Sequence, residues 1–210
     1  MEKNMKRKIG KAAVLATVFG SALQAGAVSF DGDFMLGRSW SENKVEKITT
    51  KYQANDYTLG AQVQPMGEYP VSVGLRATLS DFKKADFGEN TETAYGWDIT
   101  PEIKAWIPAE IVGTDIVLPY VKMGYTFEAL SSVTFETKDD TGKKIETSGE
   151  FSGYHVNVGA DVKITEMVGA LVEYSYISKQ QQLKNEETKI KADKTDISSQ
   201  AFLMGARVSV

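Results

Sequence analysis

The chain has no cysteine, a single histidine and only five prolines among its 210 residues. Without cysteine it can form neither a disulfide framework nor a thiolate metal site, and one histidine is a poor basis for any other metal centre. Beyond the N-terminal region, no stretch approaches the roughly 20 apolar residues that a transmembrane helix requires. We therefore expect no metal, no cofactor and no membrane-spanning helix in the mature protein.

The N-terminal residues have the layout of a secretory signal. Five Lys or Arg residues lie between Lys3 and Lys11, residues 12–23 are mostly apolar, and Ala27 ends an Ala-Gly-Ala cleavage site. This pattern predicts a cleaved signal peptide over residues 1–27, which leaves a single domain over residues 28–210. Because the signal carries five basic residues and one Glu, its removal changes the net charge from −4 to −8. Such a charge disfavours nucleic acid as a partner.

Most of the remaining chain alternates between apolar and polar residues. From Tyr154 to Ile164, one face carries Tyr, Val, Val, Ala, Val and Ile, and the other carries His, Asn, Gly, Asp and Lys. A period of two is typical of β-strands, and repeated segments of about ten such residues are typical of membrane-spanning barrels. The predicted strands are residues 29–40, a second segment ending in 57–64, then 69–79, 95–107, 116–128, 153–165, 170–178 and 199–210. We predict an all-β, eight-stranded, antiparallel up-and-down transmembrane β-barrel.

Short and long connections alternate strictly between these segments. The short ones are residues 65–68, 108–115 and 166–169, and the long polar ones are 41–56, 80–94, 129–152 and 179–198. Both termini of the mature chain fall on the side of the short turns. This arrangement predicts periplasmic turns and four surface-exposed extracellular loops, and an even number of strands leaves no open edge.

Two segments resemble a known family. Residues 172–176, Val-Glu-Tyr-Ser-Tyr, look like one of its strands, and the ending from Gly205 to Val210 is similar to its C-terminal assembly signal. The chain resembles the small eight-stranded outer-membrane β-barrels of OmpA/OmpX type, within the porin-like superfamily. The resemblance implies a place in the outer membrane of a Gram-negative cell envelope, with Gly205, Val208 and Val210 recognised by the assembly machinery. Family members usually end in Phe or Trp, where this chain has Val210.

The two faces of the strands predict two environments. Aromatic residues on the apolar face cluster toward the long loops and predict a girdle at the lipid–water interface. The polar face, which would line the lumen, carries five cations and five anions. These are Arg76, Asp98, Glu102, Lys104, Lys122, Glu128, Asp161, Lys163, Glu173 and Arg207. Charges in a narrow lumen must be paired, and an eight-stranded barrel is just wide enough for side chains to fill it. We therefore expect a plugged polar interior, with Arg76 and Glu173 as one trial pair.

These features predict a function in the envelope rather than in catalysis. A structural barrel whose loops bind an unidentified extracellular ligand fits best, with outer-membrane lipid and lipopolysaccharide as neighbours and a monomer as the expected state. A narrow channel for small solutes is the main alternative; a lipid A-modifying enzyme and a secreted lipocalin-like binder fit less well. The single histidine, His155, falls on the polar face without the His-x-Ser spacing expected of a barrel deacylase. We assign no catalytic residues.

Overall fold

The strands form a closed antiparallel barrel. The computed structural model describes residues 28–45, 48–65, 70–83, 86, 90–138, 141–185 and 192–210. The predicted signal peptide and the predicted turn residues 66–68 lie outside this part. The strands are β1 (Val28–Val45), β2 (Ile48–Pro65), β3 (Val71–Phe82), β4 (Thr91–Trp106), β5 (Val117–Thr126), β6 (Ser131–Lys138), β7 (Lys144–Lys163), β8 (Val168–Asn185) and β9 (Thr195–Ser209). Helix α2 (Ala109–Val112) and the 3-10 turn η2 (Glu128–Leu130) are the other elements in this part of the chain. No helix in the described ranges is long and apolar enough to cross a membrane.

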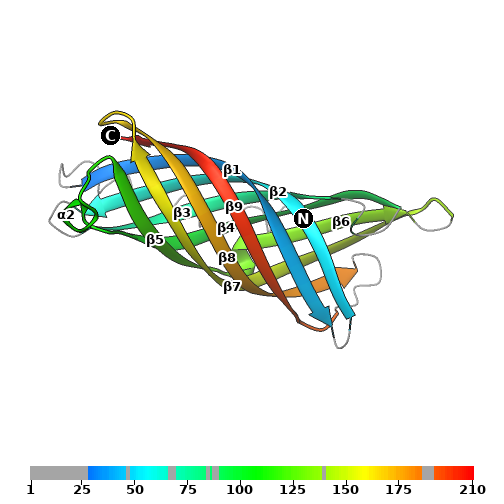
Figure 1. Cartoon of the computed structure of the whole chain (residues 1–210). Helices are drawn as coiled ribbons and strands as arrows, with labels where there is room; N and C mark the ends of the chain where they lie inside the picture. Colours follow the sequence, from blue (N-terminus) through cyan, green and yellow to red (C-terminus); the bar gives the residue numbers. More distant parts are fainter. Residues whose placement is uncertain are drawn as a thin grey trace.

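Nine strands occupy eight positions around the barrel. Apart from β5 and β6, each strand pairs with its neighbour in sequence, and β9 pairs with β1 to close the ring. Both β5 and β6 lie between β4 and β7, one beyond the other along the same position. The predicted eight-stranded up-and-down architecture is therefore confirmed, with its fifth strand divided in two (Figure 1).

The division of the fifth strand is a local bulge. Pairing of β4 with β5 ends at Glu102, opposite Gly124, and pairing of β4 with β6 begins at Asp98, opposite Ser131. In the fifth strand, six residues separate Gly124 from Ser131. The extra residues form η2, which follows Phe127. Pro101 lies in the stretch of β4 opposite this bulge, a position where a missing backbone donor is tolerated. The proline thus interrupts the ladder without breaking the strand.

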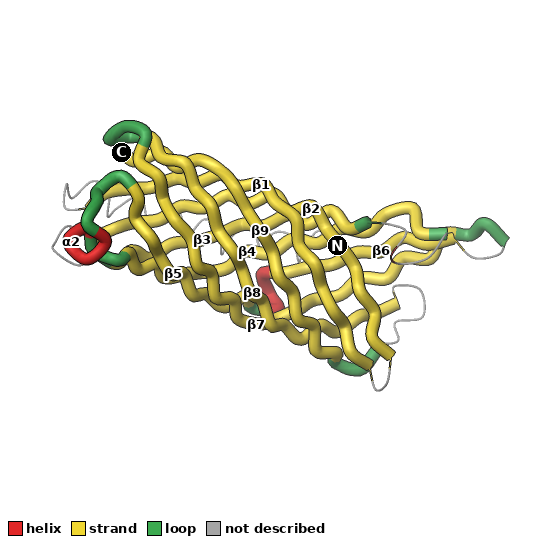
Figure 2. The backbone as a smooth tube through the Cα atoms, in the orientation of Figure 1, coloured by secondary structure: helices red, strands yellow, loops and turns green. Residues whose placement is uncertain are grey.

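The two ends of the barrel differ in length and form. At one end, which we call the turn end, α2, the β7–β8 turn and the C-terminus lie together (Figure 2). At the other, the hairpin end, the β1–β2, β3–β4, β6–β7 and β8–β9 pairs extend outward, and β6 with β7 reaches farthest (Figure 1). The alternation of short and long connections predicted this difference.

Most of the predicted long loops are strands. The stretch 41–56 is almost entirely β1 and β2, which pair up to Val45 and Ile48. The stretch 129–152 contains η2, β6 and half of β7, and Lys179–Asn185 is the end of β8 rather than an irregular loop. The boundaries were wrong because neither face of these segments meets lipid. Without lipid, the outer face no longer has to be apolar, and the alternation that marks a membrane strand disappears.

The outer face carries the apolar belt that the alternation predicted. Large apolar side chains point outward from all eight strand positions of the barrel, and about 40–60 % of their surface is exposed. Among them are Leu59, Ile103, Met123 and Val158. Aromatic residues are gathered toward the hairpin end of this belt. They are Trp40, Tyr57, Tyr95, Tyr125, Phe127, Tyr154, Tyr174, Tyr176 and Phe202. Toward the turn end, the aromatic residue Phe30 is partly buried, and Tyr69 lies outside the described residues.

Candidate functional site: the barrel interior

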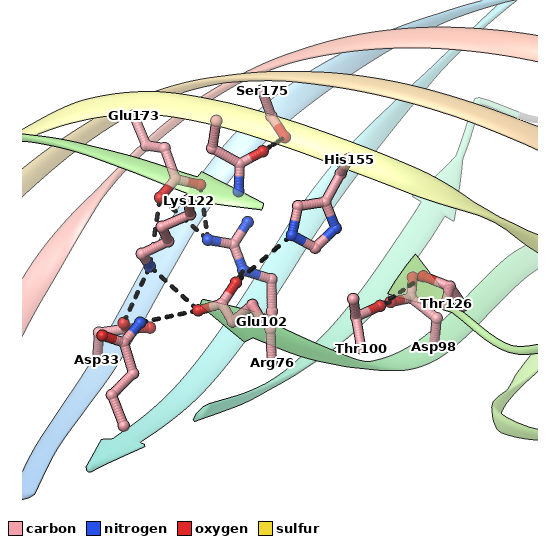
Figure 3. A network of polar contacts seen from close by, with 12 residues as sticks. Asp33, Arg76, Asp98, Thr100, Glu102, Lys122, Thr126, His155, Glu173 and Ser175 are labelled. Atoms are coloured by element: carbon pink, nitrogen blue, oxygen red, sulfur yellow. Dashed lines mark hydrogen bonds and ion pairs between the residues drawn. The ribbon is translucent and has the colours of Figure 1, made fainter. Parts of the chain in front are cut away.

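A network of buried charges crosses the lumen near its middle. Arg76 Nε lies 3.0 Å from Glu102 Oε2, and its NH2 group lies 2.8 Å from Glu173 Oε1. Lys122 Nζ lies 3.4 Å from Asp33, 3.5 Å from Glu102 and 3.3 Å from Glu173. All five side chains are nearly inaccessible to solvent. Two cations and three anions therefore form one continuous cluster across strands β1, β3, β4, β5 and β8 (Figure 3).

Neutral donors complete this cluster. Gln62 Nε2 donates to Glu102 Oε1 at 2.8 Å, and Ser72 donates to Gln62 at 2.9 Å. Tyr120 donates its hydroxyl hydrogen to Glu173 Oε2 at 3.1 Å. Buried carboxylates are stable only when such donors surround them, because an unpaired buried charge costs several kcal/mol. The cluster is therefore built to keep its charges in place.

At the turn end of the lumen, a second group of charged side chains forms ion pairs and cation–π contacts. Arg207 Nε donates to Asp161 at 2.5 Å, and its NH1 group lies 3.6 Å from Asp31. Lys104 is fully buried between two aromatic rings, with Nζ 4.3 Å from the centre of Tyr120 and 4.5 Å from that of Trp106. Such cation–π contacts satisfy a cation where no carboxylate is adjacent. Met35, Leu171 and Leu203 pack around Tyr120 at this level.

The structure brings eight of the ten predicted lumen charges inside and leaves two outside. Arg76, Glu102, Lys122 and Glu173 meet as described, and the trial pair of Arg76 with Glu173 is in contact. Asp161 and Arg207 pair with each other, Lys104 contacts the rings, and Asp98 accepts a hydrogen bond from Thr100.

The other two predictions were wrong. Glu128 falls in the bulge η2, where the alternation is broken, and it binds Lys194 on the outer surface at 2.8 Å. Lys163 is exposed because it is the last residue of β7, at the turn end of the barrel.

Several interior partners were not predicted as site residues. Asp33 in β1 and His155 in β7 both join the network, His155 with Nε2 3.5 Å from Glu102 Oε2. Asp33 could have been found, because it shares the inward parity of Met35 in the first strand. Asn157 and Ser175 are buried and are hydrogen-bonded to each other. The register between β7 and β8 that brings these two together was not evident from the sequence.

Toward the hairpin end, the network is followed by a small polar cavity. It has a volume of about 60 Å³ and is lined by Asp56, Asp98, Lys179 and His155 among others. Ligand pockets are commonly roughly 300 Å³ or larger. This cavity is therefore too small to serve as a solute-binding chamber in the conformation seen here.

The hairpin end of the lumen is closed by apolar side chains. Tyr52 and Phe82 pack edge to face with ring centres 5.7 Å apart, and Phe135 approaches Phe82 at 6.2 Å. Ile197 and Leu183 pack against the same group. We call this group, with Ala54, Ala94 and Val133, the apolar plug. It covers the polar cavity on the side away from the charge network.

Comparison with known proteins identifies the family. The model of the outer membrane protein beta-barrel domain matches residues 12–207. The chain belongs to this family of outer-membrane β-barrels. The resemblance found in the sequence is thus confirmed, and the outer membrane is the location that the family implies. No curated protein matches the chain.

Solved structures agree on the fold. Neisserial surface protein A, from Neisseria, is 13 % identical with a TM-score of 0.53, over 86 % of this chain and 96 % of that one. The outer membrane protein AlkL, determined in lipid bilayers, is 10 % identical with a TM-score of 0.52, over 88 % of this chain and 90 % of that one. At such low identity, these similarities establish the barrel and carry no ligand or activity to this chain.

Proposed function

We propose that this protein is a closed, non-conducting outer-membrane barrel that supports the envelope and presents four hairpins at the cell surface for binding. The observation that carries the proposal is the filling of the lumen at two levels. A paired charge network occupies the middle, and the apolar plug occupies the hairpin end. Ion passage would require both to open, and separating buried charge pairs is costly in a low-dielectric interior.

The hairpins support a surface-binding role. Their strands continue past the girdle aromatics, from Tyr154 back to Lys144 in β7 and from Tyr176 on to Asn185 in β8, and the apolar plug gives them a core of their own. Hairpins with a packed core present their outer faces in a fixed geometry, which lowers the entropic cost of binding a partner. The proposed assembly role of Gly205, Val208 and Val210 is compatible with β9 closing the ring, where Val210 and Phe30 exchange two backbone hydrogen bonds.

Single-channel recording tests the closed lumen. The refolded protein in a planar lipid bilayer should show negligible steady current. A double variant, Tyr52→Ala with Phe82→Ala, should show more frequent brief openings because it empties the apolar plug while leaving the network intact. A stable open current in the unmodified protein would replace this proposal with the narrow-channel alternative.

Labelling of intact cells tests the orientation and the binding role together. A cysteine at Lys144, in the β6–β7 hairpin, should react with a membrane-impermeant maleimide, whereas one at Glu166, in the β7–β8 turn, should react only after the outer membrane is permeabilised. A photo-crosslinking residue at Glu146 should then form adducts at the cell surface, with Glu110 in α2 as the control position. Labelling of Glu166 in intact cells would reverse the orientation.

A further inference from the structure

One wall of the barrel has an ordered border between apolar and polar residues. On strands β2, β1, β9 and β8, outward side chains form rows in which each residue is the cross-strand partner of the next. Toward the turn end, one row is wholly apolar or aromatic: Tyr57, Leu36, Met204 and Val172. The next row is Asn55, Arg38, Phe202 and Tyr174, and the one beyond it is Gln53, Trp40, Gln200 and Tyr176. The change from apolar to mixed rows marks where the acyl chains of the membrane give way to headgroups.

Arg38 is the charged residue in these three rows. It is exposed, and its neighbours across the strands are Asn55 and Phe202. None of the ion pairs found within the described ranges involves it. An arginine on a lipid-facing strand is costly in the hydrocarbon region and is placed favourably only where its guanidinium reaches the headgroup layer. Its position calls for an anionic group supplied by the membrane.

Two grooves meet beside this arginine. The smaller, about 150 Å³, is lined by Arg38, Asn55, Asp81 and Lys83 together with Gln53. We call it the phosphate groove. The larger, about 350 Å³, is lined by Gln53 as well, together with Trp40, Gln200, Ser198, Lys51 and Asp86. We call it the saccharide groove. Because Gln53 lines both, the two grooves are adjacent.

The lining of each groove fits a different chemical group. Arg38 and Lys83 are two cations at the border, and a guanidinium binds a phosphate through two parallel hydrogen bonds. In the saccharide groove, Trp40 is 47 % exposed and lies between Gln53 and Gln200 in register. A sugar ring has an apolar C–H face that packs on an aromatic ring and hydroxyl groups that bond to amides, which donate and accept.

Each of the three carboxylates in these grooves has a hydrogen-bond donor or a cation beside it. Asp86 accepts a hydrogen bond from the backbone N–H of Gln53 at 2.8 Å. Glu42 is the cross-strand partner of Lys51. Asp81 lines the phosphate groove, where Arg38 and Lys83 outnumber it. The site thus offers a net positive charge in the phosphate groove, and in the saccharide groove it offers aromatic and amide side chains beside Glu42, Lys51 and Asp86.

We propose that this wall binds the phosphorylated saccharide headgroup of an outer-leaflet glycolipid of the lipid A class. Arg38 and Lys83 bind the phosphate, Trp40 stacks on the sugar ring, and Gln53 and Gln200 bind its hydroxyl groups. The acyl chains of the lipid lie along the apolar row of Leu36, Tyr57 and Met204. A phosphoglyceride headgroup fills only the phosphate groove. The inference rests on the proposed placement of the barrel in the outer membrane and gives the membrane-facing side a specific partner.

Native mass spectrometry of the folded protein tests this site. The protein is released from nanodiscs of phosphatidylcholine that contain one probe lipid each: bisphosphorylated lipid A, its monophosphorylated form, or phosphatidylglycerol. We expect the protein to retain bisphosphorylated lipid A in clear preference to phosphatidylglycerol. Arg38→Gln should reduce that retention about tenfold, as the loss of a charge-assisted hydrogen bond does. Trp40→Leu should reduce retention of both forms of lipid A about fivefold.

Matched variants on other walls serve as controls. Lys144→Gln removes the same charge from the β6–β7 hairpin, and Tyr154→Leu removes an exposed girdle aromatic from β7. Both should retain lipid A as the unmodified protein does. Equal retention of phosphatidylglycerol and lipid A, or equal losses in the Arg38→Gln and Lys144→Gln variants, would overturn the proposal.

A failure of this inference is distinguishable from a failure of the proposed function. Because a nanodisc offers the same lipids on both sides, the measurement does not depend on orientation in the cell. Heat-modifiable migration on a gel shows that each variant is folded. A folded, non-conducting barrel without lipid A preference would remove the glycolipid site and leave the proposed function in place.

Discussion

Below and above the bulge in its fifth strand, the barrel has opposite interiors. Toward the turn end, charged side chains such as Arg76, Glu173 and Lys122 are buried inside, and valine, leucine and methionine side chains point outward. Toward the hairpin end, Tyr52 and Phe82 are buried inside, and charged residues lie on the outer surface. The strands other than the fifth run through both regions with an unbroken alternation of inward and outward side chains. The backbone therefore decides which positions face inward, and the surroundings of the barrel decide which kinds of residue are found there.

The interior of the barrel is therefore packed in two different ways. Where lipid surrounds the barrel, the apolar residues are needed outside, and the interior is stabilised by paired charges. Where water surrounds it, burial of apolar surface drives packing, as in a soluble protein. Each region can be perturbed separately, and the expected effects differ in size.

The largest effect is expected in the charge network. Arg76→Ala should destabilise the barrel by about 3 to 5 kcal/mol, because it leaves Glu102 and Glu173 buried beside Lys122 alone. Glu173→Ala should cost a similar amount. The double variant should cost clearly less than the two single variants together, since it removes both members of the pair. Urea unfolding in lipid vesicles measures all three, and strict additivity would show that the contact carries no coupling.

A smaller loss is expected in the apolar plug. Phe82→Ala should lower the free energy of unfolding by about 3 to 4 kcal/mol if the plug behaves as an ordinary hydrophobic core. Phe82→Leu, which keeps most of the apolar volume, is the matched control and should recover most of that loss. Hydrogen exchange at the amides of Ala54 and Ala94 reports on the same region. Unchanged exchange in the alanine variant would mean that the plug does not stabilise the hairpins.

The outer face can be compared above and below the bulge with one type of substitution. Val158→Arg places a charge in the apolar belt and should cost about 2 to 3 kcal/mol. Gln180→Arg places the same side chain on the exposed outer face of β8, near Asp196, and should change stability very little. Equal stabilities of the two variants in vesicles would contradict the assignment of the belt to lipid.

The smallest effect is expected for an exposed ion cluster on the hairpins. Lys138 and then Lys144, which both contact Glu92, lower the pKa of that carboxyl group from its usual 4.5 to about 2. Because the folded pKa is the lower one, the stabilisation is complete above pH 4.5 and is lost as the pH falls toward 2. An NMR titration of the Glu92 carboxyl carbon measures this directly. Lys138→Gln should move the midpoint back toward 4.5, and an unchanged midpoint would exclude Lys138 as the cause.

The sequence predicted the region in lipid much better than the region in water. Alternation over residues such as Val71–Leu79 places each side chain inside or outside, because both faces are strictly selected there. In β6 and the first half of β7, polar residues occur on the outer face and small or polar residues also occur inside, so a period of two cannot be recognised. Those strands are evident only from their pairing, which depends on residues far apart in the chain.

The lumen charges could be predicted wherever the two-residue alternation of the strand was unbroken. Arg76 and Glu173 follow directly from the parity of their strands. Glu128 could not be placed correctly, because it is the first residue of η2, where the alternation breaks, and no residue in Phe127–Leu130 is distinctive of such a turn. The exposure of Lys163 depends on where β7 ends, and strand ends are the least certain part of any pattern.

The bulge at η2 also divides the barrel into two regions that are expected to unfold separately. At this level one of the eight strand positions is discontinuous, and the packing inside the barrel changes from ion pairs to aromatic rings. A tube with such a joint is expected to open in two cooperative units, with the hairpin region exchanging its amide hydrogens while the membrane region stays protected. The same joint is a natural place to exchange parts. Hairpins from another barrel, joined to this one at the level of Thr126 and Ser131, would bring their own core with them and leave the membrane anchor unchanged.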